Sequence, residues 1–390
     1  MKFKFLLKQY IKMFAQTAVL PLWYRICCRQ PVQPGLVVFA DAHHNERPVS
    51  MRFLYEKLME RPEKLCIHET YLDYQRSSPG AVIRHMFDFM KWYARADCVI
   101  ICDNFLPAAS CRKRKETRVI QLWHACGALK KFGYDTTDDI PKQYRGNVFR
   151  NIDLVTVSAP KCVDPFASAM RLAEGCAQPL GVCRTDVFFQ EDWKERCRKE
   201  FYGLYPQAAG KKIVLWAPTF RGNPGSLGLP GLNLQQLQRQ LGEEWLVLSR
   251  VHPHMHADYQ DTDCKLPTDR LFPVIDVLIA DYSSLIYEYL LFEKPLVLYV
   301  PDLDHYRSRR GFYYDYSEIP GRQVKEEGGL SQAIKQEYSL YHQQDAEKKR
   351  TLLCRKREGF LNDYMSSCDG HATQRVIEYI CRTLENNEMI

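Results

Sequence analysis

The sequence has no uninterrupted run of about 20 apolar residues, the length that a membrane-spanning helix requires. It also lacks any Cys-X-X-Cys pair, and its odd number of cysteines, 15, does not suit a disulfide framework. The first residues contain neither a secretory hydrophobic region nor a small-residue cleavage site. We therefore expect reduced thiols, a cytosolic compartment and no segment that crosses a bilayer.

Acidic side chains are missing from the beginning of the chain, where the first acid is Asp41. Most of the net charge of +7 lies before that residue, so the remainder is nearly neutral. A neutral remainder argues against a broad nucleic-acid surface, and we expect no nucleic-acid partner. Metal-ligand spacing is missing as well: Pro253 interrupts the alternate histidines of RVHPHMH, and no matching acid or Cys is evident.

What the chain does have is material for a packed core. Apolar residues make up 46% of its 390 positions and aromatic residues 12%, which is typical of a globular protein. At roughly 100–200 residues per domain, this length predicts two domains.

Residues 1–30 predict an amphipathic helix on a membrane surface. Apolar and basic side chains separate onto two helical faces, with Phe3, Leu7 and Phe14 on one and Lys4, Lys8 and Lys12 on the other. Apolar burial and attraction to anionic lipid would hold such a helix at the cytoplasmic face of the cell membrane as a peripheral anchor. The alternative is a first helix packed on the protein's own core.

Short apolar runs alternate with helical or loop segments along the rest of the chain. We expect strands at residues 36–39, 97–102, 118–123, 154–157, 212–217, 245–249, 277–280 and 296–300. Helical patterns fall at 49–60 and 193–204. This alternation predicts an α/β fold with parallel sheets, arranged as two doubly wound, Rossmann-like domains at residues 31–192 and 193–390.

A histidine follows one of these strands directly. In VIQLWHACG an apolar strand runs into His124 and then into a glycine turn. Ligands of doubly wound sheets bind outside the carboxyl ends of the strands, and His exchanges protons near neutral pH. His124 is therefore a candidate general base, with a purely structural histidine as the alternative.

The second half has three strand ends suited to an anion. These ends hold hydroxyls, cations and the start of a short helix, namely Thr219 and Arg221, Arg250 and His252, and Asp281, Ser283 and Ser284. Exposed amides at a helix start and guanidinium groups both bind phosphate. We predict a phosphorylated donor in this domain, with an ordinary helix cap as the alternative for the third strand end.

Six motifs together resemble one family. They are QLWHACGALKKFGYD at 121–135, GVCRTD at 181–186, WAPTFRG at 216–222, RVHPH at 250–254, DYSSLIYEYLLFEKPLVLYVPDLDHYRSRRGFYYDY at 281–316 and CDGHATQRVIEYI at 368–380. The set is similar to the CDP-glycerol glycerophosphotransferase family, the teichoic acid primases and polymerases. Departures are Ala125-Cys126, where the family usually has Gly-Thr, and Phe220, where Trp is common.

The resemblance implies a GT-B-like pair of domains, with acceptor bound mainly by the first and CDP-linked donor by the second. It also implies a membrane-associated enzyme whose acceptor is an undecaprenyl-diphosphate-linked saccharide. Neither a cofactor nor a metal is expected, and the oligomeric state is not indicated.

The implied reaction is attack by an acceptor hydroxyl on the β-phosphorus of CDP-glycerol, with release of CMP. His124 would be the general base, and Asp186, matched through GVCRTD, would orient it or the substrate, with Asp135 competing for that role. Glu288 would accept from ribose hydroxyls, and Arg310 would close on the phosphates. The residues at the three anion-holding strand ends would bind the diphosphate.

The family contains several activities. The chain is little more than the shared core plus a short N-terminal segment, which resembles the primases, because polymerases often carry an additional N-terminal region. The polymerase and a capsule-building relative that uses CDP-ribitol stay open as alternatives. An ordinary glycosyltransferase that uses a sugar nucleotide is a further enzyme alternative. From another class, a non-catalytic membrane-surface module would bind anionic lipid or nucleotide without needing His124.

Overall fold

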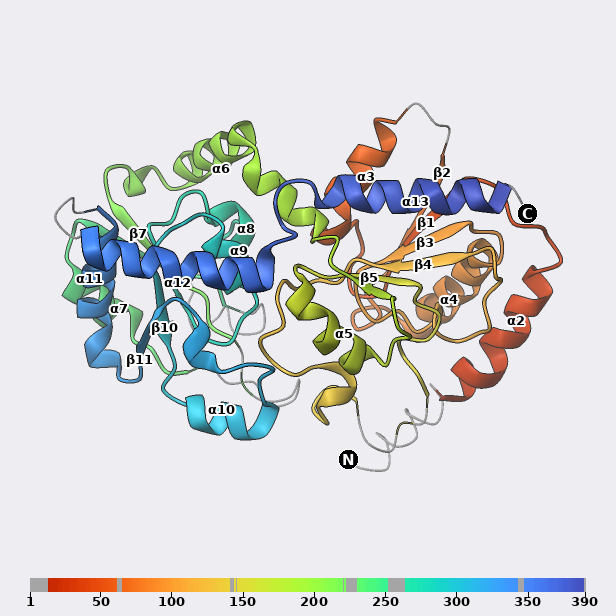
Figure 1. The fold of residues 1–390 in the computed structure, drawn as a ribbon, viewed down its shortest axis with the longest axis horizontal. Coiled ribbons are helices and arrows are strands. Elements are labelled where there is room, and N and C mark those ends of the chain that lie inside the picture. Colours follow the sequence, from red (N-terminus) through yellow and green to blue (C-terminus); the bar gives the residue numbers. More distant parts are fainter. Residues whose placement is uncertain are drawn as a thin grey trace. The chain divides into compact units, whose positions relative to one another are not determined.

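The computed structural model describes residues 13–61, 65–140, 144, 146–219, 221, 230–251, 264–342 and 347–388. The chain divides into two α/β units, each built on a parallel sheet (Figure 1). Unit 1 comprises Met1–Cys126, Phe132–Val187 and Met365–Ile390, and unit 2 comprises Gly127–Lys131 and Phe188–Tyr364.

Unit 1 contains a six-stranded sheet in the order β2-β1-β3-β4-β5-β6. Its strands are β1 (Leu36–Asp41), β2 (Cys66–Tyr71), β3 (Cys98–Ile101), β4 (Arg118–Gln121), β5 (Leu154–Thr156) and β6 (Ala177–Gln178). Every pairing is parallel. The central strands β1 and β3 are buried along their whole length, because helices cover both faces of a parallel sheet.

The helices of unit 1 are α2 (Leu20–Cys27), α3 (Val49–Met59), α4 (Pro79–Tyr93), α5 (Val163–Met170) and α13 (Ala372–Glu388). Helices α3 and α13 share one hydrophobic cluster with β1, β3 and β4, to which Leu54 and Ile377 contribute. Helix α4 carries its own buried row, Phe89, Met90 and Tyr93. Figure 1 shows α3 and α13 on one side of the sheet and α4 on the other.

Unit 2 contains a five-stranded parallel sheet in the order β11-β10-β9-β7-β8. Its strands are β7 (Lys212–Trp216), β8 (Trp245–Ser249), β9 (Val277–Ala280), β10 (Leu296–Tyr299) and β11 (Arg322–Val324). Its helices are α6 (Glu191–Leu204), α7 (Leu234–Leu241), α8 (Thr268–Leu271), α9 (Leu285–Leu290), α10 (Leu303–Arg310), α11 (Leu330–His342) and α12 (Glu347–Met365). Helices α7 and α11 share a hydrophobic cluster with the strands.

The α/β alternation is confirmed, and the strands predicted at 245–249 and 277–280 have those bounds. The predicted domain limits need correction. The division falls between Val187 and Phe188, and Met365–Ile390, assigned from the sequence to the second domain, belongs to unit 1. The reason is that α13 carries an apolar face, including Val376 and Ile380, that completes the core of unit 1.

The predicted membrane anchor is described only from residue 13 onward. Phe3, Lys4, Leu7, Lys8 and Lys12 lie outside the described residues. Beyond them the chain forms a π-helical turn (Ala15–Val19) and α2, whose Leu20 and Tyr24 are buried. The opposite side of this segment remains exposed at Phe14, Leu22 and Ile26. Within the described residues, no helix has the length and apolar character needed to cross a membrane.

Candidate active site

Polar side chains gather at the carboxyl ends of three neighbouring strands in unit 1. β1 leads into His43 and His44, β3 into Asp103 and β4 into His124. These strands are adjacent in the order β1-β3-β4, so their ends meet at one edge of the sheet. In a doubly wound sheet, ligands usually bind outside the carboxyl ends of the strands, at the point where the strand order reverses.

His124 pairs with Asp103 at this edge. Nδ1 of His124 lies 3.2 Å from Oδ2 of Asp103, and the His124 side chain is 49% exposed. The other carboxylate oxygen, Oδ1, accepts from the backbone N–H of Asn104 at 2.6 Å. Burial alone would raise the pKa of Asp103, but hydrogen bonding to His124 and the nearby imidazoles of His124 and His43 lower it. An ionised Asp103 can therefore fix the His124 ring through Nδ1, so that Nε2 is the nitrogen that can accept a proton.

The backbone before His124 is held in an uncommon conformation. Trp123 has φ 58°, in the left-handed region that bulky residues rarely adopt. Its N–H donates to Oε1 of Gln121 at 3.0 Å, and Nε2 of Gln121 donates to the carbonyl of Asp103 at 3.1 Å. The Trp123 and His124 rings lie 4.4 Å apart between centroids. Gln121 thus ties the end of β4 to the end of β3, and such strain is typical of functional turns.

A second carboxylate organises the end of β1. Oδ2 of Asp41 lies 2.9 Å from Nδ1 of His44 and accepts from the backbone N–H of His43 at 2.7 Å. Interaction with the Asp41 carboxylate raises the pKa of both His43 and His44. Nδ1 of His43 lies 3.9 Å from Asp41 and 3.8 Å from Asp103, without a hydrogen bond among the described residues. The edge therefore brings three imidazoles and two carboxylates together in one cluster.

Asp186 is placed elsewhere than the resemblance implied. Its carboxylate accepts from the backbone N–H groups of Ala372 and Thr373, at 3.1 and 2.7 Å, and so caps the start of α13. Burial raises its pKa, and the side chain is 3% exposed. The carboxylate paired with His124 is Asp103, and the competing Asp135 accepts from Ser168 Oγ at 2.9 Å. Asp186 therefore has a structural role in this unit.

The motif that contains Asp186 packs on the C-terminal motif. A Cβ at Gly181, which has φ +88°, would lie 2.1 Å from the carbonyl oxygen of Ser367. Nε of Arg375 donates to the carbonyl of Leu180 at 2.8 Å. GVCRTD and CDGHATQ are thus two sides of one internal contact of unit 1.

In unit 2, Arg221 is engaged by two carboxylates. It makes a bidentate pair with Asp302, Nε to Oδ2 at 2.8 Å and Nη2 to Oδ1 at 3.0 Å, and Nη1 donates to Asp281 Oδ2 at 2.8 Å. Burial would lower the pKa of Arg221, but the hydrogen bonds and charges of the two carboxylates raise it. Arg221 therefore organises the ends of β7, β9 and β10, rather than presenting an unoccupied fork to a phosphate.

Thr219 stands beside this cluster. Its N–H donates to Asp281 Oδ1 at 2.9 Å, whereas its hydroxyl is buried and has no partner among the described residues. A buried hydroxyl without a hydrogen bond is costly, and a bound ligand would satisfy it. This oxygen is the most direct sign of a ligand site in unit 2.

The other predicted donor residues occupy varied positions. Nη1 of Arg250 donates to the carbonyl of Cys264 at 3.0 Å, and Ser283 Oγ accepts from the N–H of Leu285 at 3.3 Å. Ser284 precedes α9 without a side-chain cap hydrogen bond, and Glu288 is 6% exposed within that helix. His252 lies outside the described residues.

Arg310 belongs to a contact between two motifs. Its Nε donates to the carbonyl of Lys131 at 3.0 Å, and the N–H of Lys131 donates to the carbonyl of Gly311 at 3.1 Å. Gly127, with φ +64°, abuts Tyr287, because a Cβ there would lie 2.1 Å from Cζ of that ring. The segment after His124 is thus built into unit 2.

Among the described residues, no group of three or more His, Cys, Asp or Glu could hold a metal ion.

Sequence reasoning missed Asp41, His43, His44 and Asp103. The signal was present, because LVVFADAHH and CVIICD both run from a buried strand into these residues. What was missing was the order of the strands, which decides that the ends of β1 and β3 lie beside that of β4.

Comparison with known proteins gives a consistent set of matches. The sequence profile described as CDP-Glycerol:Poly(glycerophosphate) glycerophosphotransferase matches residues 22–382. The teichoic acid ribitol-phosphate primase of Bacillus spizizenii is 34% identical over 371 residues, covering 90% of this chain and 92% of the relative. The teichoic acid glycerol-phosphate primase of Bacillus subtilis is 32% identical over 303 residues, covering 72% and 73%.

The fold has a counterpart among solved structures. A variant of the wall teichoic acid polymerase TagF superimposes with a TM-score of 0.75 at 20% identity, covering 98% of this chain and 99% of that one. At this identity the likeness establishes a shared fold.

Proposed function

Because this chain belongs to the CDP-glycerol:poly(glycerophosphate) glycerophosphotransferase family, we propose that it transfers glycerol phosphate from CDP-glycerol to a lipid-linked saccharide during teichoic acid synthesis. The acceptor is an undecaprenyl-diphosphate-linked saccharide, and the step is the priming one. The observation that carries the proposal is the His124–Asp103 pair, 3.2 Å apart at the carboxyl ends of neighbouring strands.

Unit 1 supplies the proton transfer. Nε2 of His124 accepts the proton of the acceptor hydroxyl while Asp103 holds Nδ1 and stabilises the imidazolium that forms. The hydroxyl oxygen bonds to the β-phosphorus of CDP-glycerol, and the bond from that phosphorus to the oxygen bridging to the α-phosphate breaks. CMP leaves with the bond electrons, and the product is a glycerol phosphodiester.

Unit 2 supplies the donor site. The buried hydroxyl of Thr219 is a hydrogen-bond donor without a partner among the described residues, and Ser283, Ser284 and Arg250 stand at neighbouring strand ends. Such donors stabilise charge that accumulates on the leaving CMP. Arg221 keeps the carboxylates of Asp281 and Asp302 neutralised, so that the phosphates do not meet uncompensated negative charge. The GT-B arrangement of the units is part of this proposal.

CDP-ribitol is a second candidate donor. The relative that matches 90% of the chain is a ribitol-phosphate primase, whereas the glycerol-phosphate primase matches 72%. Both relatives are primases, and each is covered over more than two thirds of its length.

The proposal includes peripheral attachment to the cytoplasmic face of the cell membrane through the N-terminal segment. Exposed Phe14, Leu22 and Ile26 support it. Deleting residues 1–30 would also remove the buried Leu20 and Tyr24, so exchanging Lys4, Lys8 and Lys12 for Glu is the cleaner test. The exchange should weaken binding to anionic vesicles and leave turnover of a soluble acceptor unchanged.

The test of the reaction is CMP release by the purified protein, with CDP-glycerol or CDP-ribitol and a lipid-diphosphate disaccharide analogue. We expect acceptor-dependent release that collapses in His124→Ala, and the product mass counts the units added. One unit supports the primase, whereas a long series supports a polymerase. No release with either donor overturns the proposal and favours a sugar-nucleotide transferase or a binding module.

A further inference from the structure

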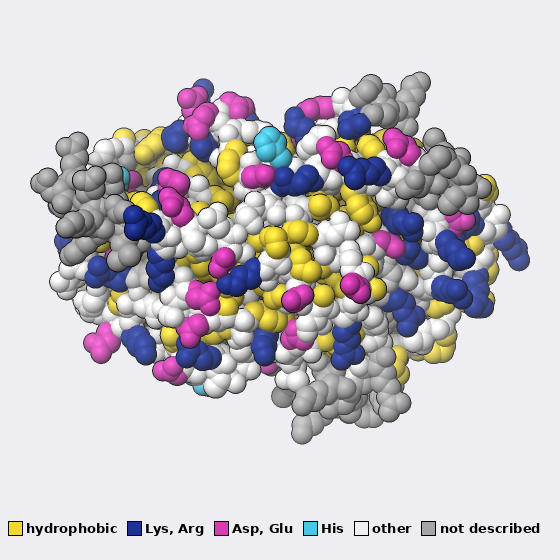
Figure 2. Space-filling model, in the orientation of Figure 1, with side chains coloured by type: hydrophobic (Ala, Val, Ile, Leu, Met, Phe, Trp, Pro, Cys, Tyr) yellow, Lys and Arg dark blue, Asp and Glu magenta, His cyan; other side chains and the backbone are white. Residues whose placement is uncertain are grey.

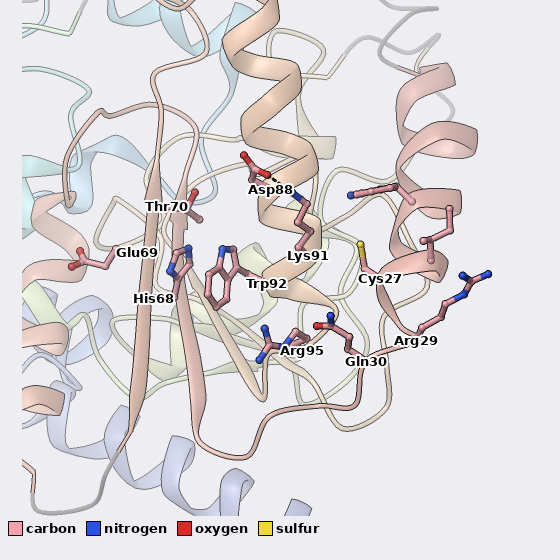
Figure 3. Close-up of a pocket in the computed structure, with 12 residues that line it drawn as sticks. Cys27, Arg29, Gln30, His68, Glu69, Thr70, Asp88, Lys91, Trp92 and Arg95 are labelled. Atoms are coloured by element: carbon pink, nitrogen blue, oxygen red, sulfur yellow. Dashed lines mark hydrogen bonds and ion pairs between the residues drawn. The ribbon is translucent and has the colours of Figure 1, made fainter.

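Unit 1 contains a cavity apart from the His124 edge. It has a volume of about 830 Å³ and is lined by β2, the end of α4 and the end of α2, as Figure 3 shows. β2 is the outermost strand of the described sheet, where it pairs with β1, and its residues His68, Glu69 and Thr70 line the cavity. The volume suits a small amphiphile or headgroup.

One wall of the cavity is a flat aromatic surface. His68 of β2 stacks on Trp92, with centroids 3.8 Å apart and planes 21° apart, and the two rings lie together in Figure 3. Burial lowers the pKa of His68, so this ring is neutral at physiological pH. The wall therefore adds surface area without adding charge.

The carboxylates of the lining are already neutralised. Glu69 points away from the cavity in Figure 3 and makes a bidentate pair with Arg47, with distances of 2.8 and 2.6 Å. Asp88 pairs with Lys91 at 2.7 Å on the surface of α4. Neither acid is left to repel an anion.

Two arginines in the lining have no carboxylate partner within the described part of the chain. Arg95 donates to Oε1 of Gln33 at 2.6 Å and lies 5.8 Å from the centroid of Trp92. Arg29 is exposed on the outer rim, beyond the end of α2. The α2 segment that adjoins the cavity carries Arg25 and is followed by Arg29, and no acid precedes Asp41 in the sequence. Figure 2 shows Lys and Arg side chains gathered over the part of unit 1 that carries α2.

Exposed apolar side chains adjoin this positive cavity. Ile26, 42% exposed, lines it, and Leu22 at 62% lies one turn earlier on α2. Adjacent exposed hydrophobics on a helix indicate a partner surface. A hydrophobic strip beside arginines is complementary to a molecule with an acyl chain and a phosphate.

We propose that this cavity binds the phosphate headgroup of an anionic membrane lipid, with Arg95 on the phosphate, Arg29 at the outer rim where it faces the lipid surface, and Leu22 and Ile26 in the acyl region. The inference rests on the membrane attachment proposed above, and it adds a defined headgroup site. Such a site fixes how unit 1 is oriented on the bilayer, which a row of lysines on a helix does not.

The test is flotation of the full-length protein with phosphatidylglycerol vesicles and with neutral phosphatidylcholine vesicles. Arg29→Gln and Arg95→Gln should each weaken partition onto the anionic vesicles about fivefold, as expected for one interfacial charge. Arg95→Lys should keep most of the partition. Ile26→Ser should weaken partition onto both kinds of vesicle. The matched control is Arg382→Gln on α13, a residue whose side chain is 77% exposed, which should change nothing.

A second arm identifies the ligand. Brominated phosphatidylglycerol should quench tryptophan fluorescence, and Trp92→Phe should remove part of that quenching. Inorganic phosphate and CDP are added separately. If micromolar phosphate or CDP prevents the protein from binding the vesicles, the cavity is a site for a soluble anion and the proposal is overturned. Unchanged flotation of both arginine variants would overturn it as well.

Catalysis is measured in a separate assay without vesicles. CMP release with a soluble acceptor should be unchanged in Arg29→Gln and Arg95→Gln, and melting temperatures should match the wild type. Loss of CMP release in correctly folded variants would place the cavity in the reaction and overturn the proposal. Failure of the proposed function would instead show as absent CMP release in the wild type, whatever the vesicles report.

Discussion

Oδ2 of Asp103 lies 3.2 Å from Nδ1 of His124 and 3.8 Å from Nδ1 of His43, so one carboxylate faces two imidazoles. Asp103→Asn should keep the fold and lower kcat for CMP release by about 10²-fold or more, because an amide can hold the wrong imidazole tautomer in place. Steady-state rates measure this. Asp88→Asn on α4 is the matched control, and a rate within threefold of wild type for Asp103→Asn would contradict the assignment.

His44 should stabilise unit 1 at low pH. The hydrogen bond to Asp41 raises its folded pKa above the ordinary value, so its stabilising contribution is full below about pH 6.5 and is lost as pH rises through the folded pKa. The melting temperature should therefore fall more on His44→Gln substitution at about pH 6 than at about pH 8.5. The charged and titratable groups that act on the pKa of His44 are Asp41, His43 and Asp103.

His68 provides a control of opposite sign for that experiment. Burial lowers its pKa, so folding is opposed when the ring must be protonated, and its contribution improves as pH rises. The melting-temperature difference between wild type and His68→Gln should therefore favour the wild type more at high pH. Equal pH trends for the two variants would contradict both assignments.

Arg221 should matter for the stability of unit 2. Its side chain is 17% exposed, and its loss would leave Asp281, 2% exposed, and Asp302 without their cation. Removing one partner of a buried ion pair costs about 3–5 kcal/mol. We expect Arg221→Met to lower the unfolding free energy of unit 2 by that order, measured by denaturant titration. Adding Asp302→Asn should restore part of the loss, and no restoration would argue against this ion pair.

Gly127 should tolerate no side chain. An Ala Cβ would lie 2.1 Å from Tyr287, and the backbone φ is +64°. Gly175 is a matched control, because it has φ +81° but nothing within 4 Å of the added atom. Gly175→Ala should cost about 1–2 kcal/mol from the left-handed conformation alone, and Gly127→Ala should cost clearly more. Equal losses in thermal unfolding would show that the Tyr287 contact is unimportant.

Asp186 should act on stability and not on the chemical step. It satisfies two N–H groups at the start of α13, and loss of a helix cap costs about 0.5–2 kcal/mol. Asp186→Ala should lower the melting temperature while kcat, measured well below the transition, stays within about threefold of wild type, since no chemical step uses this carboxylate. A large fall in kcat at unchanged melting temperature would show that Asp186 has a role in catalysis.

Local patterns were sufficient for much of the fold. Buried apolar runs such as Val277–Ala280 and Leu296–Tyr299 predicted strands because a parallel sheet hides both faces of each strand. β2 (Cys66–Tyr71) was missed because it is an edge strand with mixed polarity, CIHETY, and no continuous apolar run.

His124 could be found from sequence because a strand runs straight into it, and that is a local feature. Its partner could not, since Asp103 reaches it only through the pairing of β3 with β4. Likewise, the sequence predicted Arg221 as a phosphate ligand, whereas in the structure it pairs with Asp281 and Asp302, which lie far along the chain.

The sequence by itself therefore determined the α/β class, the two-unit organisation, the family and the place of His124 at the end of a strand, because these depend on periodicity and contiguous motifs. Only the tertiary structure decided that Asp103 pairs with His124 and Asp281 with Arg221, and that the C-terminal helix belongs to unit 1. The physical reason is that charge pairing and core completion act between residues distant in sequence, where strand order and helix packing set the distances.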